Sequence, residues 1–582
     1  MLKRKISSYA FYIAVFLLSF ILFNLLTATI LFIFNVGIQS WYLPCALIFS
    51  VALTILLMKR RKMVKIRDIL IVVVLPIFAI SGLVIINGKI YDYTWDWNDY
   101  HKLAIGMMVD GWNPLMETEY EFNDKNEDNE EKINLGEYKF NWGDNYAKAS
   151  HIFAANVSKI TGNVESGKVL NDISIIIVFL FVFALCLHIE KSWAFSILLA
   201  FTVVTPVTIV AQFLTNYVDI LVYLYMFLLA TLFFWFEYGK EYQKEILGIF
   251  FATLIILINI KFSSFAYAGV LCAFYYGWYI YRYKKDKAFD KKFFKKFSLT
   301  AFAAVMIGVF VVGLSVYPRN LLTHGHPFYP LMGEGKKDIM TANSPYYFKD
   351  KNNIEKFFIA TFGEADNIIM ADRREAELKI PFTINEREIE FTEYCDIRIS
   401  GNGLLFSGIL IISIIIIMLL TKKTFTEDKK LFIMLALPIV MTLILIAAMS
   451  DVWWARYFPQ LHFIVFAALI MLSRHKACFT KAILYTFFGV IIINNMMFFL
   501  GAIRQSYRYT QSVHEVVGAF KDSNNAEECK MLVGTSSFFG GFYSIRHDYD
   551  EYEIIYDDPK ALDTTNNLWA LPNFVTARCQ KK

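Results

Sequence analysis

Charged residues are scarce in this sequence. Asp, Glu, Lys and Arg make up only 19% of the 582 residues, whereas hydrophobic residues make up 57% and the mean hydropathy is +0.44. Soluble globular domains carry about 25% charged residues, so this composition excludes an ordinary soluble protein. The net charge of +5 is also small. The basic residues lie in short segments between apolar runs rather than on one basic face, which argues against nucleic-acid binding.

Cysteine is scarce as well. The seven cysteines form neither a C-x-x-C pair nor the Cys/His spacing typical of a zinc site. Cys45, Cys186 and Cys272 lie inside apolar runs, where cysteine behaves as a small hydrophobic residue. A signal-peptide cleavage site of the A-x-A type is missing too, and the first apolar run, from Tyr9 to about Val36, is too long for a signal peptide. We therefore expect no zinc site and an uncleaved first membrane span.

Long apolar runs are what the sequence has in abundance. A transmembrane helix needs about 20 mostly apolar residues, and runs of this kind predict about thirteen spans. The predicted spans lie at 9–35, 42–58, 68–87, 171–188, 194–214, 219–237, 245–261, 264–281, 299–316, 404–420, 430–449, 459–473 and 480–501. The fold class is thus an all-α polytopic membrane protein.

The loops between these spans predict an orientation. Basic clusters that share one side of the membrane lie at 59–62, 282–296, 422–430 and 474–481. Because loops rich in Lys and Arg face the cytoplasm, we expect a cytoplasmic N-terminus in a multi-pass protein of the cell membrane. The loops 88–170 and 317–403 and the C-terminus are then extracytoplasmic.

Both long loops need secondary structure of their own, because structureless loops of that length are uncommon. Apolar spacing at 99–109 and 147–159 predicts helices that lie along the membrane interface. The segment 117–132 is rich in acidic residues without the spacing of a calcium loop, which favours a solvated loop.

The chain divides into a membrane domain, 1–504, and a small extracytoplasmic domain, 505–582. The second part alternates β-like pieces at 531–534 and 552–556 with a helix-like piece at 513–521. We predict a small α/β appendage.

One short stretch follows directly on the apolar run 69–86. It reads Trp95-Asp96-Trp97-Asn98-Asp99-Tyr100-His101, so that two carboxylates and an imidazole emerge at a membrane surface. Helical spacing would place Asp96, Asp99 and Tyr100 on one face. The alternative is the start of a solvated loop with interfacial tryptophans.

Other ionisable residues are predicted at the same membrane face. They are Asp219, Lys261, Arg319, His324, His326 and Arg456. Taken singly, Lys261 and Arg456 fit snorkelling side chains, and Asp219 fits a helix cap. Taken together with Asp96, they fit a transfer from a lipid phosphate, which needs a base for the acceptor and cations for the leaving phosphate.

The stretch 95–101 resembles the W-D-x-x-x-Y-H signature of bacterial GT-C superfamily glycosyltransferases, relatives of protein O-mannosyltransferases and aminoarabinose transferases. Weaker matches are Tyr317-Pro-Arg-Asn320 with His324-Gly-His-Pro-Phe-Tyr-Pro330, and Trp453-Trp-Ala-Arg-Tyr457. The resemblance covers roughly residues 70–500 and not the tail. It implies a GT-C-like fold that transfers a sugar from a polyprenyl-phosphate donor to an extracytoplasmic glycan, lipid or protein, with inversion.

The resemblance also implies roles. Asp96 matches the catalytic carboxylate of the family, and Arg456 matches an arginine thought to hold the lipid phosphate. Asp99 stands at a position that is usually uncharged, so either carboxylate is a candidate base, with His101 as a further catalytic candidate. The remaining candidates for donor binding are Tyr100, Asp219, Lys261, Arg319, His324 and His326. No cofactor is certain, and a divalent metal bridging Asp96 and Asp99 is the alternative that stays open.

Rival functions predict other patterns. A transporter or flippase of lipid-linked sugars should show inverted repeats and charges near the middle of the membrane, whereas the charges here lie at the outer ends of spans. A ligase or polymerase acting on the same kind of donor would differ in its loop motifs. A purely structural scaffold would leave the convergent charged residues unexplained.

Overall fold

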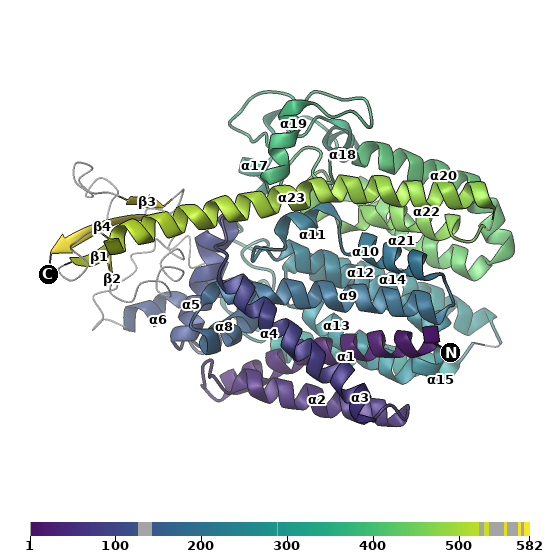
Figure 1. Ribbon diagram of the computed structural model, residues 1–582, viewed down its shortest axis with the longest axis horizontal. Helices are drawn as coiled ribbons and strands as arrows, with labels where there is room; N and C mark the ends of the chain where they lie inside the picture. Colours follow the sequence, from purple (N-terminus) through teal and green to yellow (C-terminus); the bar gives the residue numbers. More distant parts are fainter. Residues whose placement is uncertain are drawn as a thin grey trace.

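The computed structural model describes residues 2–125, 142–287, 289–475 and 477–522, together with four strands of the tail (Figure 1). In the described part of the chain, nine helical segments are long and apolar enough to cross a membrane. The protein is therefore a helical, multi-pass membrane protein. The nine segments are Leu2–Ile33 (α1), Tyr42–Arg60 (α2), Ile66–Gly88 (α3, η1 and α4), Val164–His188 (η3 and α9), Asp219–Tyr238 (α12), Lys291–Val312 (α15 and η5), Phe406–Glu427 (α20), Lys429–Ala448 (α21) and Cys478–Glu515 (within α23).

The other four predicted spans are helical as well. Their elements are α10 (Trp193–Val203) and α11 (Val207–Gln212), α13 (Gln243–Ile258), α14 (Phe262–Lys285) and α22 (His462–Leu472). The prediction of one continuous helix at 194–214 was wrong, because the chain breaks between α10 and α11. Pro206 lies at this break, where its ring and its missing N–H are incompatible with a helix interior.

Helix α12 forms the centre of the membrane domain. It is buried along nearly its whole length and packs against α9, α13 and α14. Aromatic contacts contribute to this core, with Phe233 of α12 stacked on Tyr275 of α14 at 3.9 Å between ring centroids. The first residue of α12 is Asp219, so the rigid core of the protein positions this carboxylate.

The first long loop contains the two predicted helices, and both are packed inside the protein. α5 (Lys102–Asp110) follows directly on a π-helix, η2 (Trp97–His101), and α8 (Ala149–Thr161) comes later in the loop. Both α5 and α8 are buried over most of their residues, and they pack against each other, with α8 also against α1. Of the acid-rich segment, α6 (Glu119–Lys125) is helical, and residues 126–132 lie outside the described residues.

The second long loop is made of short pieces. They are α16 (Tyr317–His324), α17 (Met340–Asn343), η6 (Tyr346–Phe348), α18 (Asn353–Phe362), α19 (Glu386–Glu390) and η7 (Phe391–Glu393). Three further 3-10 turns connect helices, η4 (Lys240–Tyr242), η8 (Ala455–Tyr457) and η9 (Pro459–Leu461). In Figure 1, α17, α18 and α19 lie together on one side of the long helix α23.

Helix α23 (Cys478–Asp522) runs along the molecule and ends at the strands of the tail (Figure 1). The helix-like piece predicted at 513–521 is the last part of this helix, not a separate element. The strands form one sheet in the order β2-β1-β4-β3, in which β1 pairs parallel to β2 and antiparallel to β4. Their bounds are Cys529–Gly534 (β1), Tyr552–Ile555 (β2), Trp569–Leu571 (β3) and Val575–Lys581 (β4).

The loops that carry the basic clusters are joined by ion pairs. Glu237, near the end of α12, pairs with Arg282 at 2.7 Å and with Lys430 at 3.5 Å. Arg474, after α22, pairs with Asp428 at 3.5 Å. These loops therefore share one end of the helical domain, opposite to the end at which α12 begins.

Candidate functional site

Arg456 lies at the centre of a charged cluster at the other end of the domain. It belongs to the short turn η8 between α21 and α22, and its side chain is only 6% exposed. Its Nε donates to Asp219 Oδ2 at 2.8 Å and its Nη2 to Asp96 Oδ2 at 2.6 Å. Its Nη1 donates to Asp396 Oδ2 at 3.3 Å. All three nitrogens of the guanidinium are thus bonded to carboxylates from three distant parts of the chain.

Lys261 adds a second cation to this cluster. It sits in the turn between α13 and α14, and its Nζ lies 2.5 Å from Asp219 Oδ1. Asp219 therefore bridges the two cations with its two oxygens. Three carboxylates face these two cations, and Arg398 acts on Asp396 as a further positive charge.

Aromatic rings enclose the two cations. The guanidinium of Arg456 lies 4.6 Å from the ring of Tyr217, 5.1 Å from Trp454 and 5.2 Å from Tyr457. The ammonium of Lys261 lies 4.3 Å from the same Tyr457 ring. Cations over aromatic faces gain roughly 0.5–2 kcal/mol each, depending on how far they are desolvated. These rings restrict the orientations of the Arg456 and Lys261 side chains. They therefore do more than anchor the protein at a membrane surface, as an aromatic belt does.

The three carboxylates differ in their access to solvent. Asp219 is 1% exposed, whereas the side chains of Asp96 and Asp396 are each 21% exposed. Burial raises the pKa of Asp396, and Arg456 opposes this effect. Burial alone would lower the pKa of Arg456, but the carboxylates, Asp219 first, raise it well above its ordinary value. Arg456 is therefore a permanent cation. Its partner Asp219 is buried, whereas its partners Asp96 and Asp396 are accessible to solvent.

The backbone around Asp96 forms a π-helix, a rare conformation that is often found at functional sites. In such a turn the hydrogen bonds run between residues five apart, which brings Asp96 and His101 to the same side. Asp99 and Tyr100 are half-buried on this turn. The ring of Tyr100 lies 4.2 Å from that of His101, and the negative charge of Asp96 acts on both rings.

His101 forms a buried pair with His151 of α8. The His101 Nδ1 and His151 Nε2 atoms are 2.6 Å apart, so one ring donates to the other. Burial lowers the pKa of His101 to about 4 and that of His151 well below its ordinary value. Both rings are therefore neutral at physiological pH. The outer nitrogens, His101 Nε2 and His151 Nδ1, have no hydrogen-bond partner among the described residues.

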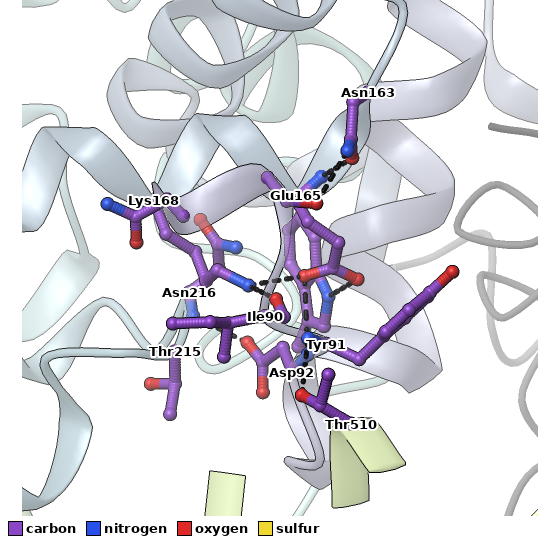
Figure 2. Close-up of polar contacts among 12 residues, drawn as sticks. Ile90, Tyr91, Asp92, Asn163, Glu165, Lys168, Thr215, Asn216 and Thr510 are labelled. Atoms are coloured by element: carbon purple, nitrogen blue, oxygen red, sulfur yellow. Dashed lines mark hydrogen bonds and ion pairs between the residues drawn. The ribbon is translucent and has the colours of Figure 1, made fainter. Parts of the chain in front are cut away.

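A second buried network supports the turn that carries Asp96 (Figure 2). Glu165 lies between two buried lysines, with Lys102 Nζ at 3.0 Å and Lys168 Nζ at 2.7 Å. Its Oε1 also accepts a hydrogen bond from Trp97 Nε1 at 3.3 Å. The neighbour of Asp96 in sequence is thus anchored to the start of the Val164–His188 segment.

Asp92 forms the other half of this network (Figure 2). Its Oδ1 accepts from the backbone and hydroxyl of Thr94 at 2.9 and 2.7 Å, and its Oδ2 accepts from the backbone N–H of Asn216 at 2.7 Å. Burial raises the pKa of Asp92 to about 6, and the charge of Glu165 adds to this effect. Asn216 lies just before Asp219, so Asp92 links the two chain segments that supply carboxylates to Arg456.

Three predicted donor-binding residues have their contacts elsewhere. Arg319 Nη1 donates to the carbonyl of Pro114 at 2.6 Å. His324 stacks on Tyr329 at 3.8 Å, and His326 Nδ1 accepts from the backbone of Phe328 at 3.2 Å. These contacts organise the start of the second loop. The cluster around Arg456 unites Asp96, Asp219, Lys261 and Arg456 from the sequence prediction.

No family model matches this chain, and no match was found among curated proteins. The resemblance to GT-C glycosyltransferases therefore depends on the motif residues alone. The chemistry of the site has to be argued from its geometry.

The site does not fit the metal that the sequence left open. Among the residues that the structure describes, no group of three or more His, Cys, Asp and Glu side chains is placed to hold a metal ion. Asp96 Oδ2 also lies 2.6 Å from Arg456 Nη2, so this carboxylate is already paired with a cation. We derive no step through a metal bridging Asp96 and Asp99.

Sequence reasoning missed several residues of the site. Asp396 lies near the end of the second loop, eight residues before the next apolar run, so it does not stand at the end of a span as the other cluster residues were predicted to do. His151 is a single histidine on a predicted amphipathic helix. Glu165 and Lys168 left a readable signal, since opposite charges three residues apart stand directly before an apolar run.

Proposed function

We propose that the protein is a membrane glycosyltransferase with a GT-C-like architecture. It transfers a sugar from a polyprenyl-phosphate donor to a hydroxyl of an extracytoplasmic acceptor. The observation that carries this proposal is the Arg456 cluster, where a buried guanidinium, a buried ammonium and solvent-reachable carboxylates meet at one end of the helical domain.

Arg456 is suited to bind the donor phosphate. A guanidinium forms short, paired hydrogen bonds with a phosphate, and two of its nitrogens point to the two more exposed carboxylates, Asp96 and Asp396. A phosphate can replace these carboxylates while Asp219 keeps its bond to Nε. Donor binding would then release Asp96 from its ion pair. The base becomes available only when the donor is in place.

The transfer step needs one base and one cation site. Asp96 accepts the proton of the acceptor hydroxyl, whose oxygen attacks the anomeric carbon from the face opposite the phosphate. The bond between the anomeric carbon and the phosphate oxygen breaks, and its electron pair stays on the phosphate. Arg456, assisted by Lys261, stabilises the charge that develops there. A single displacement of this kind inverts the anomeric centre.

The other predicted residues take supporting roles in this proposal. Tyr100 and the neutral His101 line the turn next to Asp96 and offer hydrogen-bonding groups to the acceptor sugar or hydroxyl. Asp99 is the alternative base on the same π-helix. Asp219 positions Arg456 and Lys261 rather than reacting itself, because its two oxygens are already bonded to them.

We also propose the orientation. The end that carries the Arg456 cluster faces away from the cytoplasm, and the end with the basic loops faces the cytoplasm, following the preference of Lys and Arg for cytoplasmic loops. The loops joined through Glu237 and the loops joined through Arg456 lie at opposite ends of the domain, which supports this arrangement. Membrane lipids and the lipid-linked donor are then the expected partners, with no role for nucleic acid.

Purified protein in liposomes, incubated with a panel of radiolabelled polyprenyl-phosphate sugars and acceptor glycans, tests the function. We expect release of polyprenyl phosphate and labelling of an acceptor with one donor, and loss of both with Arg456→Ala. The matched control is Arg508→Ala, an exposed arginine on α23 that pairs with Glu393 at 3.0 Å, because such surface pairs contribute little. Movement of intact donor across the vesicle without any sugar transfer would establish the transporter alternative instead.

A further inference from the structure

An apolar cavity lies at the end of the domain opposite the Arg456 cluster. Its volume is ≈ 190 Å³, and residues of α9, α10, α12, α21 and α22 line it. Most of the lining is apolar, with Phe195, Phe227, Phe463 and Phe466 among the large side chains. The cavity therefore suits a hydrocarbon chain.

The depth of the cavity corresponds to one leaflet of a bilayer. Its lining on α12 extends from Phe227 to Tyr238, the last residue of that helix. At 1.5 Å per residue this distance is about 16 Å, close to half of the roughly 30 Å hydrocarbon core. Asp219 stands at the first residue of the same helix, about 30 Å away by the same rise.

The rim of the cavity is basic. Lys191 and Arg474 both line it, together with the hydroxyl of Ser473. Lys191 Nζ donates to Ser473 Oγ at 3.1 Å and lies 5.4 Å from the ring of Phe195, whereas Arg474 is 3.5 Å from the carboxylate of Asp428. Of these two cations, Arg474 thus pairs with a carboxylate and Lys191 with a neutral hydroxyl.

Two further observations favour an anion at this rim. Burial lowers the pKa of Lys191, and the charge of Arg474 lowers it further, so a negative group between them would relieve both effects. The Tyr238 hydroxyl, also at the rim, is buried without a hydrogen-bond partner among the residues the structure describes. A phosphate at this rim would offer an acceptor to Tyr238 and a negative charge to the two cations.

We propose that this cavity binds one anionic phospholipid of the leaflet opposite the Arg456 cluster. An acyl chain fills the apolar cavity, and the headgroup phosphate lies between Lys191 and Arg474. This site is separate from the proposed donor site, and its occupancy does not depend on glycosyl transfer.

Native mass spectrometry of the full chain tests the proposal. The protein is released from nanodiscs containing equal amounts of phosphatidylglycerol and phosphatidylcholine, and the lipids retained at increasing collision energy are counted. We expect one tightly retained phosphatidylglycerol. Lys191→Ala combined with Arg474→Ala should reduce its retention at least tenfold, whereas Lys59→Ala with Arg60→Ala, two exposed cations at the end of α2, should leave it unchanged.

A second variant tests the cavity itself without altering charge. Ala230→Phe places a ring among the lining residues, and Ala79→Phe adds the same ring at an exposed position on α4. We expect loss of the retained lipid only with Ala230→Phe. Equal retention of both lipids by the wild type, or unchanged phosphatidylglycerol retention in the Lys191/Arg474 variant, overturns the proposal. Unchanged retention in Ala230→Phe overturns it too, because the lipid would then lie outside the cavity.

Discussion

Substitution of Asp96 by Asn should have opposite effects on donor binding and on transfer. Asp96 is one of three carboxylates on Arg456, bonded to Nη2 at 2.6 Å, and its side chain is 21% exposed. Asn keeps nearly the same volume and an oxygen that accepts from Arg456. The substitution removes the negative charge that competes with the donor phosphate. It also removes the basic lone pair that would take the acceptor proton.

The two effects differ in size. Loss of a general base lowers the rate about 10²–10⁴-fold, which corresponds to roughly 3–5 kcal/mol in the barrier. A hydrogen bond to a charged group contributes about 1.5–3 kcal/mol, and partial exposure reduces this to about 1 kcal/mol. Polyprenyl phosphate should therefore bind about fivefold more tightly to Asp96→Asn than to the wild type.

Two assays measure these quantities separately. Titration calorimetry with polyprenyl phosphate alone gives the affinity, and single-turnover transfer from the radiolabelled donor gives the rate. Asp396→Asn is the matched control, because Asp396 has the same exposure and also pairs with Arg456, at 3.3 Å. It should tighten binding while lowering the rate much less. If Asp96→Asn binds polyprenyl phosphate no better than the wild type, or transfers sugar at an undiminished rate, the reasoning is refuted.

Three further predictions follow from the same geometry. Asp219→Asn should destabilise the protein by about 3–5 kcal/mol, because it leaves buried cations without a partner. Adding Lys261→Met should recover part of the lost stability, which thermal unfolding in detergent measures. The pKa of His101 is about 4 in the folded protein, below its ordinary 6.5, so the unfolded chain binds the proton first. The contribution of His101 to stability is then complete above about pH 6.5 and falls, by on the order of 3 kcal/mol, as the pH drops to about 4. Because the lowered pKa of His151 adds a slope of the same sign, unfolding curves of His101→Gln should have a shallower slope than the wild type, and an unchanged slope would contradict the assignment. Cysteine at Asn352, in a cysteine-free background, should react with an impermeant maleimide in intact cells, and labelling only after permeabilisation would reverse the orientation.

The sequence was sufficient to find four residues of the cluster. Asp96, Asp219, Lys261 and Arg456 all lie at the ends of apolar runs. Helices that cross a membrane place alternate ends at the same face, so residues at these ends must share a surface even when they are far apart in the chain. Hydrophobicity and charge alone therefore predicted that they would come together. Their pairing, with Asp96 bonded to Arg456, depends on side-chain packing and was not predictable.

Other parts required the three-dimensional structure. Asp396 belongs to a loop whose path is determined by contacts with other loops, among them the hydrogen bond from Trp454 Nε1 to its carbonyl at 3.1 Å. The helices α5 and α8 have the apolar spacing of interfacial helices, but their polar sides are buried against protein, as the pairing of His101 with His151 shows. The spacing of apolar residues in a sequence indicates that one face of a helix is apolar. It does not indicate whether solvent or protein covers the opposite face.

The length of helix α23 sets the distance between the membrane domain and the C-terminal strands. Thr510 accepts a hydrogen bond from the backbone N–H of Tyr91 at 3.0 Å, close to the turn that carries Asp96, and the helix continues to Asp522. At 1.5 Å per residue, this last part extends about 18 Å beyond the level of Thr510 before the chain reaches its strands. Each residue inserted or deleted between Thr510 and Asp522 would change that height by about 1.5 Å and turn the strands by about 100°. A seven-residue deletion, close to two helical turns, would therefore lower the sheet by about 10 Å and leave it facing nearly the same direction.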